Sequence, residues 1–223
     1  MAEGCHRVAG AGGGRRRPGA GPGVRNRAPY ADRVDLRAWI SAEHDGLRDR
    51  FAHAITPHVP AARWRERAGD GGSSIAWLVL HTAWHEDLAM AAAVRGTEPL
   101  LITWRGDVGL AGVAPTGGLG EAEDPAVTAA VDLDALVAYA GAVHEATAMW
   151  LDSADLDAFD DVPPAGARIA DLAGVTADAV PWLHGMWAGK PVGWFVQWEA
   201  VGHRQGHLGE MVSVRSRLGL SPF

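Results

Sequence analysis

The sequence predicts an all-α fold, a four-helix bundle with a long crossover between its second and third helices. Four segments place apolar residues at helical spacing, and proline or glycine bounds them. The connection from Arg105 to Asp124 is rich in Gly, Pro and acids and is too long for a tight turn, so it indicates a crossover or a flap over a site. The best candidate for a strand is the short segment LLITW, Leu100 to Trp104.

The first two helices have clear start and stop signals. The first should begin at Asp32 or Asp35 and run to Thr56, because Pro57 cannot continue it. Its expected buried stripe consists of Leu36, Trp39, Ile40, Leu47 and Phe51. The second should follow a serine N-cap in SSIAW and run to Arg95, which precedes a stop signal, Gly96. Its expected inner face consists of Trp77, Leu78, His81, His85 and Leu88.

The third and fourth helices follow the same rules. The third should run from about Asp132 to about Asp152. Its expected stripe consists of Leu136, Ala140, Val143, Thr147 and Trp150. An irregular stretch and the short apolar piece VPWLHGMW lead to the fourth helix, which Pro191 opens in a favoured first-turn position and Gly219 ends.

Composition and charge exclude several classes of protein. Of the 223 residues, 48% are hydrophobic, yet no apolar run approaches the roughly 20 residues that span a bilayer, so we expect no membrane partner. The single cysteine, Cys5, leaves no disulfide framework and no cysteine-based metal site, which fits a cytoplasmic location. The formal net charge of −7 argues against a nucleic-acid partner.

The first 30 residues differ in composition from the rest. They hold six arginines and one acid among glycines and prolines. Such a segment cannot offset the entropy of its own ordering, so we expect a disordered Gly/Arg-rich tail in residues 1–30 and the bundle domain in residues 31–223. No apolar stretch of the kind that a twin-arginine export signal needs follows Arg15, Arg16 and Arg17.

Two histidines stand four residues apart in HRQGHLGEM, which runs from His203 to Met211. His203 and His207 therefore project from one face of the fourth helix. Buried imidazoles need hydrogen bonds or a metal, because burying unsatisfied polar groups is costly. A metal site in a bundle takes ligands from facing helices, and His81, in the apolar run LVLHTAWHED, is the best third candidate. Three neutral imidazoles leave coordination positions open, as in catalytic metal sites.

The residue pattern alone leaves alternatives to this site. Helix histidines that bond only backbone, acids or water would give the same spacing. His81 and His85 form a second pair four residues apart, so all four histidines could bind, or His85 could support the ligands or be exposed. Glu199 and Glu210 could each orient an imidazole, although a solvated helix face is the expected role of both. No residue stands out as a separate general base.

Other histidines and tryptophans have mainly structural interpretations. His144 and His184 are expected to be satisfied structural histidines. Four tryptophans near the start of the fourth helix could line the mouth of a pocket: Trp182, Trp187, Trp194 and Trp198. RGDVG is no phosphate loop, because it lacks the Gly-Lys-Ser pattern, and no serine-hydrolase elbow is present in the sequence.

Both histidine segments resemble the DinB/YfiT-like superfamily. HRQGHLGEMVSVRSRLG is similar to the family's last-helix signature, in which HxxxH precedes Gly-Gln or Gly-Glu, an arginine and a terminal glycine. SIAWLVLHTAWHEDLAM is similar to its second helix, where one histidine follows an apolar run. The resemblance covers roughly Asp32 to Gly219. The chain departs from the family's pattern in three features: Glu210 where Gln is common, the extra His85 and the basic tail.

The resemblance implies a four-helix bundle that binds a divalent metal, zinc, nickel or iron, through His81, His203 and His207. Homodimers are frequent among such proteins, and some relatives are transferases or isomerases that use the thiols mycothiol or bacillithiol. We therefore expect a metal-dependent thiol S-transferase that joins a low-molecular-weight thiol to a small-molecule electrophile. The alternatives are a non-catalytic metal-binding or stress-response bundle and an interaction protein that binds no metal.

Overall fold

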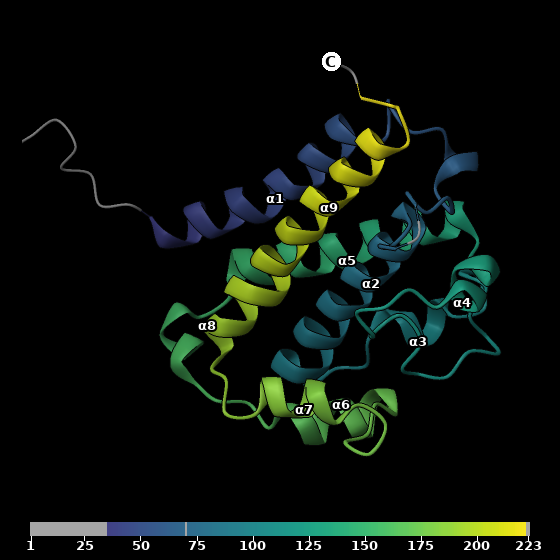
Figure 1. Cartoon of the computed structure of the whole chain (residues 1–223). Helices are drawn as coiled ribbons and strands as arrows, with labels where there is room; N and C mark the ends of the chain where they lie inside the picture. The colour runs from purple at the N-terminus through teal and green to yellow at the C-terminus, as the bar shows by residue number, and fades with distance from the viewer. Residues whose placement is uncertain (1–34, 70, 222–223) are drawn as a thin grey trace, which may run out of the picture. The chain divides into compact units, whose positions relative to one another are not determined.

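The four predicted long helices form a bundle in the computed structural model, which describes residues 35–69 and 71–221 (Figure 1). Every regular element in these ranges is helical. The bundle consists of α1 (Leu36–Ala54), α2 (Ile75–Asp87) continued by η2 (Leu88–Arg95), α5 (Leu133–Ser153), and α8 (Val192–Phe195) continued by η4 (Val196–Gly202) and α9 (His203–Arg217). α1 and α2 each pack against both α5 and α9. The predicted all-α bundle is therefore confirmed.

Short helices connect the long ones. They are η1 (Ala61–Arg63), α3 (Leu100–Trp104), α4 (Pro125–Ala130), η3 (Leu156–Asp160), α6 (Ala165–Ala173) and α7 (Pro181–Trp187). α3 and α4 belong to the crossover between α2 and α5, as predicted for a long connection. α6 packs against η2 and α7. The short helices α6 and α7 lie at one end of the bundle (Figure 1).

The ends of the long helices are where the sequence signals place them. Asp35, Ser74 and Asp132 are the N-caps of α1, α2 and α5, and each side-chain oxygen accepts a hydrogen bond from the backbone N–H three residues on. Gly96 ends η2 with a φ of 67°, a left-handed conformation that glycine adopts without steric cost. Local capping chemistry thus sets these boundaries.

LLITW, the best candidate for a strand in the sequence, forms the helix α3 instead. Asp87, at the end of α2, caps α3 from outside: its two carboxylate oxygens accept hydrogen bonds from Leu100 N at 3.0 Å and Leu101 N at 2.8 Å. Tyr139 Oη donates to the same carboxylate at 3.0 Å. Burial raises the pKa of Asp87 to about 6. A short apolar run has no decisive period, so this distant cap decides its conformation.

The buried faces of two helices also differ from the expected stripes. All thirteen residues of α2 are buried, so this helix is a central element rather than an amphipathic one. Leu36 and Trp39 of α1 are 48% and 54% exposed, contrary to their predicted burial. Arg37 faces α5 instead, where its guanidinium donates to Leu151 O and Ala154 O, both at 2.6 Å. Through these two hydrogen bonds Arg37 lies against α5, while Leu36 and Trp39 face outward.

The prediction of a disordered tail in residues 1–30 lies outside the described residues. The domain boundary at residue 31 lies there too. Among the helices of the described ranges, none combines the length and the apolar character that crossing a bilayer takes.

Candidate metal centre

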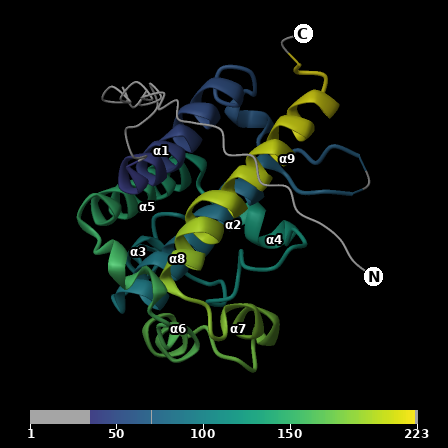
Figure 2. The same cartoon turned by 90° about the vertical axis from the view of Figure 1, so that its left-hand side faces the viewer.

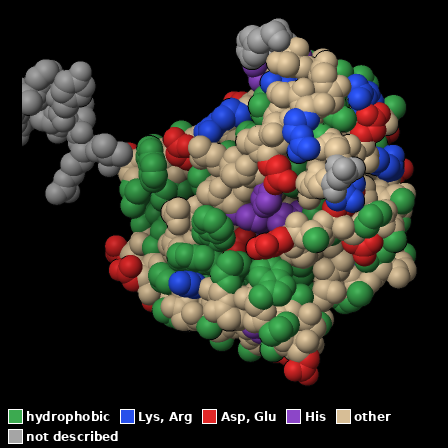
Figure 3. Space-filling model, viewed as in Figure 1, with side chains coloured by type: hydrophobic (Ala, Val, Ile, Leu, Met, Phe, Trp, Pro, Cys, Tyr) green, Lys and Arg blue, Asp and Glu red, His purple; other side chains and the backbone are tan. Residues whose placement is uncertain are grey.

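Four histidines from two helices meet in one pocket of about 460 Å³. His81 and His85 come from α2, and His203 and His207 from the start of α9. The histidines lie in a hollow of the surface, between acidic and apolar side chains (Figure 3). The other lining residues are Glu121, Trp182, Met186, Trp198, Gly202, Gly206 and Glu210. None of the lining residues comes from α1 or α5, so the pocket lies outside the bundle interior.

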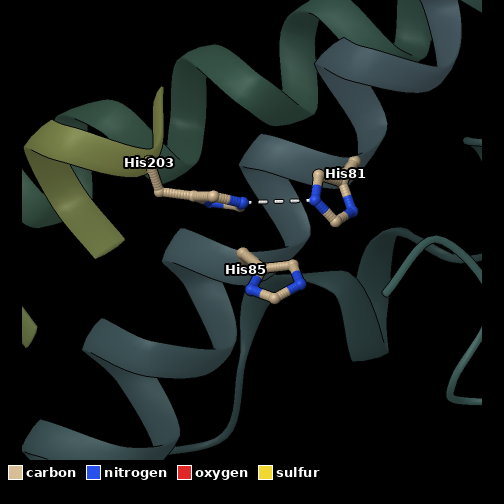
Figure 4. A group of neighbouring side chains, drawn as sticks. All are labelled: His81, His85 and His203. Atoms are coloured by element: carbon tan, nitrogen blue, oxygen red, sulfur yellow. Dashed lines mark hydrogen bonds between the residues drawn. The ribbon is translucent and has the colours of Figure 1, made fainter. Parts of the chain in front are cut away.

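The three predicted ligands turn their Nε2 atoms toward one another. His203 Nε2 lies 3.2 Å from His81 Nε2 and 3.1 Å from His207 Nε2. Figure 4 shows the first of these contacts, which bridges α2 and α9. Nitrogens bound to one tetrahedral ion at about 2.0–2.1 Å would lie about 3.4 Å apart. The separations of His203 from His81 and from His207 are therefore close to those that a shared ion requires.

The opposite ring nitrogens of these histidines face oxygen atoms. His81 Nδ1 donates to Gly118 O at 2.8 Å, and His207 Nδ1 donates to Glu210 Oε2 at 2.9 Å. His203 Nδ1 lies 3.7 Å from Glu199 Oε2. The hydrogen bonds of His81 and His207 place their protons on Nδ1 and leave their Nε2 lone pairs free for a cation, whereas His203 Nδ1 makes no hydrogen bond. A cation satisfies such an arrangement.

Burial keeps two of the imidazoles neutral. Burial, together with the neighbouring His85, lowers the pKa of His81 to about 3. The same two causes lower the pKa of His203 to about 2. Only neutral imidazole has a lone pair to offer a metal, so both rings are ready to bind a cation at neutral pH.

His85 is buried beside the three predicted ligands rather than exposed. Its ring centroid lies 4.5 Å from that of His81 and 4.7 Å from that of His203, and it points into the same space (Figure 4). One ligand atom each of His81, His85 and His203 lies within 4.8 Å of the other two. However, His85 Nε2 donates to Leu119 O at 3.2 Å, and its Nδ1 lies 3.4 Å from Glu199 Oε2. Both of its nitrogens thus already face protein oxygens.

The expectation that Glu199 lies on a solvated helix face was wrong, because this residue is fully buried. It lies in η4, a π-helical segment that directly precedes His203. Trp187 Nε1 donates to Glu199 Oε1 at 2.6 Å, while Oε2 faces the Nδ1 atoms of His85 and His203. Glu199 precedes His203 by four residues, so its carboxylate lies on the same side of the helix as this ring. This carboxylate places a negative charge beside two of the four imidazoles, without a hydrogen bond to either Nδ1.

The crossover supplies the backbone acceptors for α2. The carbonyl groups of Gly118 and Leu119 accept the hydrogen bonds from His81 and His85. Gly118 has a φ of 93°, and a Cβ built on it would lie 3.2 Å from Leu80 Cγ. Only glycine fits this close approach without strain. The crossover therefore covers one side of the site, as the flap interpretation predicts.

Aromatic side chains and glycines shape the rest of the pocket. Trp182 stacks on His85 at a centroid distance of 6.0 Å, and Trp198 lies 6.1 Å from the ring of His203. A Cβ built on Gly206, which lies between the two α9 histidines in the sequence, would meet no atom within 4 Å. Of the four tryptophans predicted at a pocket mouth, Trp182 and Trp198 line the pocket, whereas Trp187 and Trp194 do not.

The remaining candidate histidines lie elsewhere. His184 Nε2 donates to Val175 O at 2.9 Å. His144 lies on α5, where it stacks on His44 with ring centroids 4.2 Å apart. Among the described residues, His44, Asp45 and His144 form a second group of clustered ligand atoms. The two rings are parallel to within 5°, so their in-plane lone pairs do not converge.

Comparison with known families agrees with this geometry. Residues 43–211, more than half of the 223-residue chain, match the model of the DinB superfamily. The chain belongs to the DinB superfamily. The match includes all four histidines of the pocket.

A solved structure has the same fold as this DinB-superfamily chain. It is described as a conserved protein of locus from Enterococcus faecalis, with a TM-score of 0.60 and 19% sequence identity over 84% of this chain and 99% of that one. At this identity, the similarity shows the fold alone. No curated protein matches the chain.

Proposed function

We propose that this protein is a divalent-metal-dependent thiol S-transferase in which His81, His203 and His207 hold the metal. The observation that carries the proposal is the convergence of three Nε2 atoms, with separations of 3.2 and 3.1 Å, while each Nδ1 faces an oxygen. Zinc, nickel and iron all accept imidazole ligands of this kind. His85 acts as a positioning residue, because both of its nitrogens face oxygens of the protein.

The site favours a thiol as the co-substrate. When bound, a divalent ion held by neutral imidazoles supplies a positive charge that lowers the pKa of a thiol beside it. The chain's own residues position the partners: Gly206 leaves space next to the ligands, and Trp182 and Trp198 provide apolar walls for an electrophile. In the overall transfer, a sulfur–carbon bond forms, the bond from that carbon to its leaving group breaks, and the thiol proton is released.

Acidic side chains line the pocket. The lining includes Glu121 and Glu210 and no arginine or lysine. A divalent ion held by the histidines would offset this negative charge for a thiol that carries a carboxylate. A homodimer in the cytoplasm, which the family resemblance and the single cysteine suggest, completes the proposal.

A thiol-transfer assay tests the activity. The full chain, loaded in turn with zinc, nickel and iron, is mixed with an aromatic chloride electrophile and one of three thiols: N-acetylcysteine, mycothiol or bacillithiol. We expect at least one pair of metal and thiol to react faster than the uncatalysed mixture, and His207→Ala to abolish the gain. If all three metals bind but no thiol reacts faster, the protein is the non-catalytic metal-binding bundle.

A further inference from the structure

A second cavity lies in the bundle interior and shares no residue with the metal pocket. Its volume is about 290 Å³, and all four long helices line it. The apolar lining residues are Leu47, Phe51, Ala52, Val79, Ala83, Val137, Ala140, Leu208 and Met211. A mainly apolar cavity with a few polar groups at one place is typical of small-molecule sites.

The cavity has an entrance between α1 and α5. Arg48 and Ala52 of α1 and Val137 of α5 line it and are exposed. Figure 2 shows these two helices next to each other, and they pack against each other. A ligand can therefore enter without passing the metal pocket.

Polar groups gather on the α2 and α9 side of the cavity. Arg204 Nη1 lies 2.8 Å from Glu86 Oε2 and donates to His144 Nδ1 at 3.3 Å. His44 Nε2 donates to Glu86 Oε1 at 2.9 Å. The Glu86 side chain is 2% exposed, so this network is built into the core rather than added at the surface.

Arg204 has donors that the protein does not use. All of its hydrogen bonds and ion pairs within the described residues involve Nη1. Its Nε and Nη2 have no partner there and are not buried, so both reach accessible space. Nε and Nη2 form the edge of a guanidinium that binds a carboxylate through two parallel hydrogen bonds.

The charge of the lining suits one negative group. Among the lining residues, Arg48 and Arg204 contribute two positive charges and Glu86 one negative charge. Arg48 also pairs with the exposed Glu145, outside the lining, at 2.5 Å, which leaves Arg204 as the residue for a carboxylate. Burial, with His44 and Arg204 nearby, lowers the pKa of His144 to about 4, so this ring adds no charge at neutral pH. The metal pocket, by contrast, has two lining glutamates and no basic side chain other than its histidines.

We propose that the bundle cavity is a second ligand site, which binds a small apolar monocarboxylate. The carboxylate pairs with Nε and Nη2 of Arg204, and the hydrocarbon part lies among the apolar residues of the four helices. A medium-chain fatty acid and an aromatic acid share this chemistry. Neutral and cationic analogues lack the charge that Arg204 recognises.

Calorimetric titration of the full chain tests the site with octanoate and phenylacetate as probes, and with octanol and octylammonium as matched analogues. Gly141 of α5 lines the cavity, and a Cβ built on it meets no atom within 4 Å, so Gly141→Leu fills the cavity without touching the polar network. Gly209→Leu is the matched control, since Gly209 is also an unobstructed helical glycine but lines neither cavity. Gly206→Leu blocks the metal pocket instead.

We expect octanoate, phenylacetate or both to bind once per chain, at least about tenfold more tightly than octanol. Binding should be lost in Gly141→Leu and kept in Gly209→Leu and Gly206→Leu. Loss of binding in Gly206→Leu but not in Gly141→Leu would place the carboxylate at the metal centre and overturn the proposal. Binding of neither acid, or binding of octanol as tight as octanoate, would overturn it as well.

Discussion

His81 Nε2 and His203 Nε2 lie 3.2 Å apart, although 122 residues separate them in the chain. The contact joins α2, the most buried helix, to the start of α9. A hydrogen bond to the carbonyl of Gly118 fixes the His81 ring from behind, and the buried carboxylate of Glu199 lies 3.7 Å from Nδ1 of His203. Preorganisation of this kind lets a site bind a cation without first rearranging its ligands.

Gly118→Ala should weaken both the fold and the site. Its φ of 93° strains any other residue, and the added Cβ would lie 3.2 Å from Leu80 Cγ. We expect a loss of about 1–3 kcal/mol in the free energy of unfolding. Metal affinity should fall too, because the Gly118 carbonyl orients His81. Urea unfolding and chelator competition measure the two effects.

Gly112→Ala is the control for this substitution. Gly112 lies in the same crossover, its φ is not positive, and a Cβ there meets no atom within 4 Å. We expect it to change neither property. Equal effects of the two substitutions would show that the crossover is merely sensitive to alanine and does not fix His81.

Glu199→Gln should reduce metal affinity while the fold persists. The amide retains an acceptor for Trp187 Nε1 but removes the negative charge that faces His85 and His203. Loss of such an orienting partner costs about 10–100-fold in metal affinity. Glu210→Gln should cost less, because the Glu210 side chain is 39% exposed and water can replace it beside His207. Chelator competition ranks the two variants, and an equal or reversed order would contradict the role given to Glu199.

Stability should fall on acidification, partly because of His144. Burial lowers its folded pKa from 6.5 to about 4, so between these values the unfolded chain binds more protons. Its contribution is present above pH 6.5 and is lost as the pH falls toward 4, by at most about 1.4 kcal/mol per pH unit. The charged or titratable groups around it are His44, Asp45, Arg48, Glu86 and Arg204.

The comparison of parent and His144→Gln isolates this contribution. Unfolding free energies are measured in a chelator across the same pH range. The raised pKa of Asp87 has the opposite sign, since its contribution is lost as the pH rises toward 6, but it is common to both proteins. The parent should show the steeper loss of stability toward acid pH. Parallel curves would mean that His144 titrates in the folded protein as it does in the unfolded chain.

Much of the fold follows from local signals in the sequence. Caps at Asp35, Ser74 and Asp132 and the stop at Gly96 mark helix ends because their chemistry acts within one turn. The conformation of α3 depends instead on Asp87, which lies more than ten residues earlier. No local pattern contains that cap.

The candidate site, like the fold, could be predicted from the sequence only where local spacing determines it. Four-residue spacing places His203 and His207 on one face of a helix, so their pairing can be expected from the sequence. The burial of Glu199 could not, because it depends on α7, where Trp187 donates to its carboxylate. The orientation of His85 depends on Leu119 in the crossover, whose path no spacing rule predicts.

The most direct test of the account is the metal content per chain of the parent and of four variants, each with one pocket histidine replaced by alanine. The proteins are equilibrated at neutral pH with zinc, nickel, iron or manganese and then analysed for bound metal. We predict about one ion per chain for the parent and for His85→Ala, and a sharp loss in His81→Ala, His203→Ala and His207→Ala. An unchanged metal content in His207→Ala, or no bound ion in the parent, would contradict the three-histidine centre.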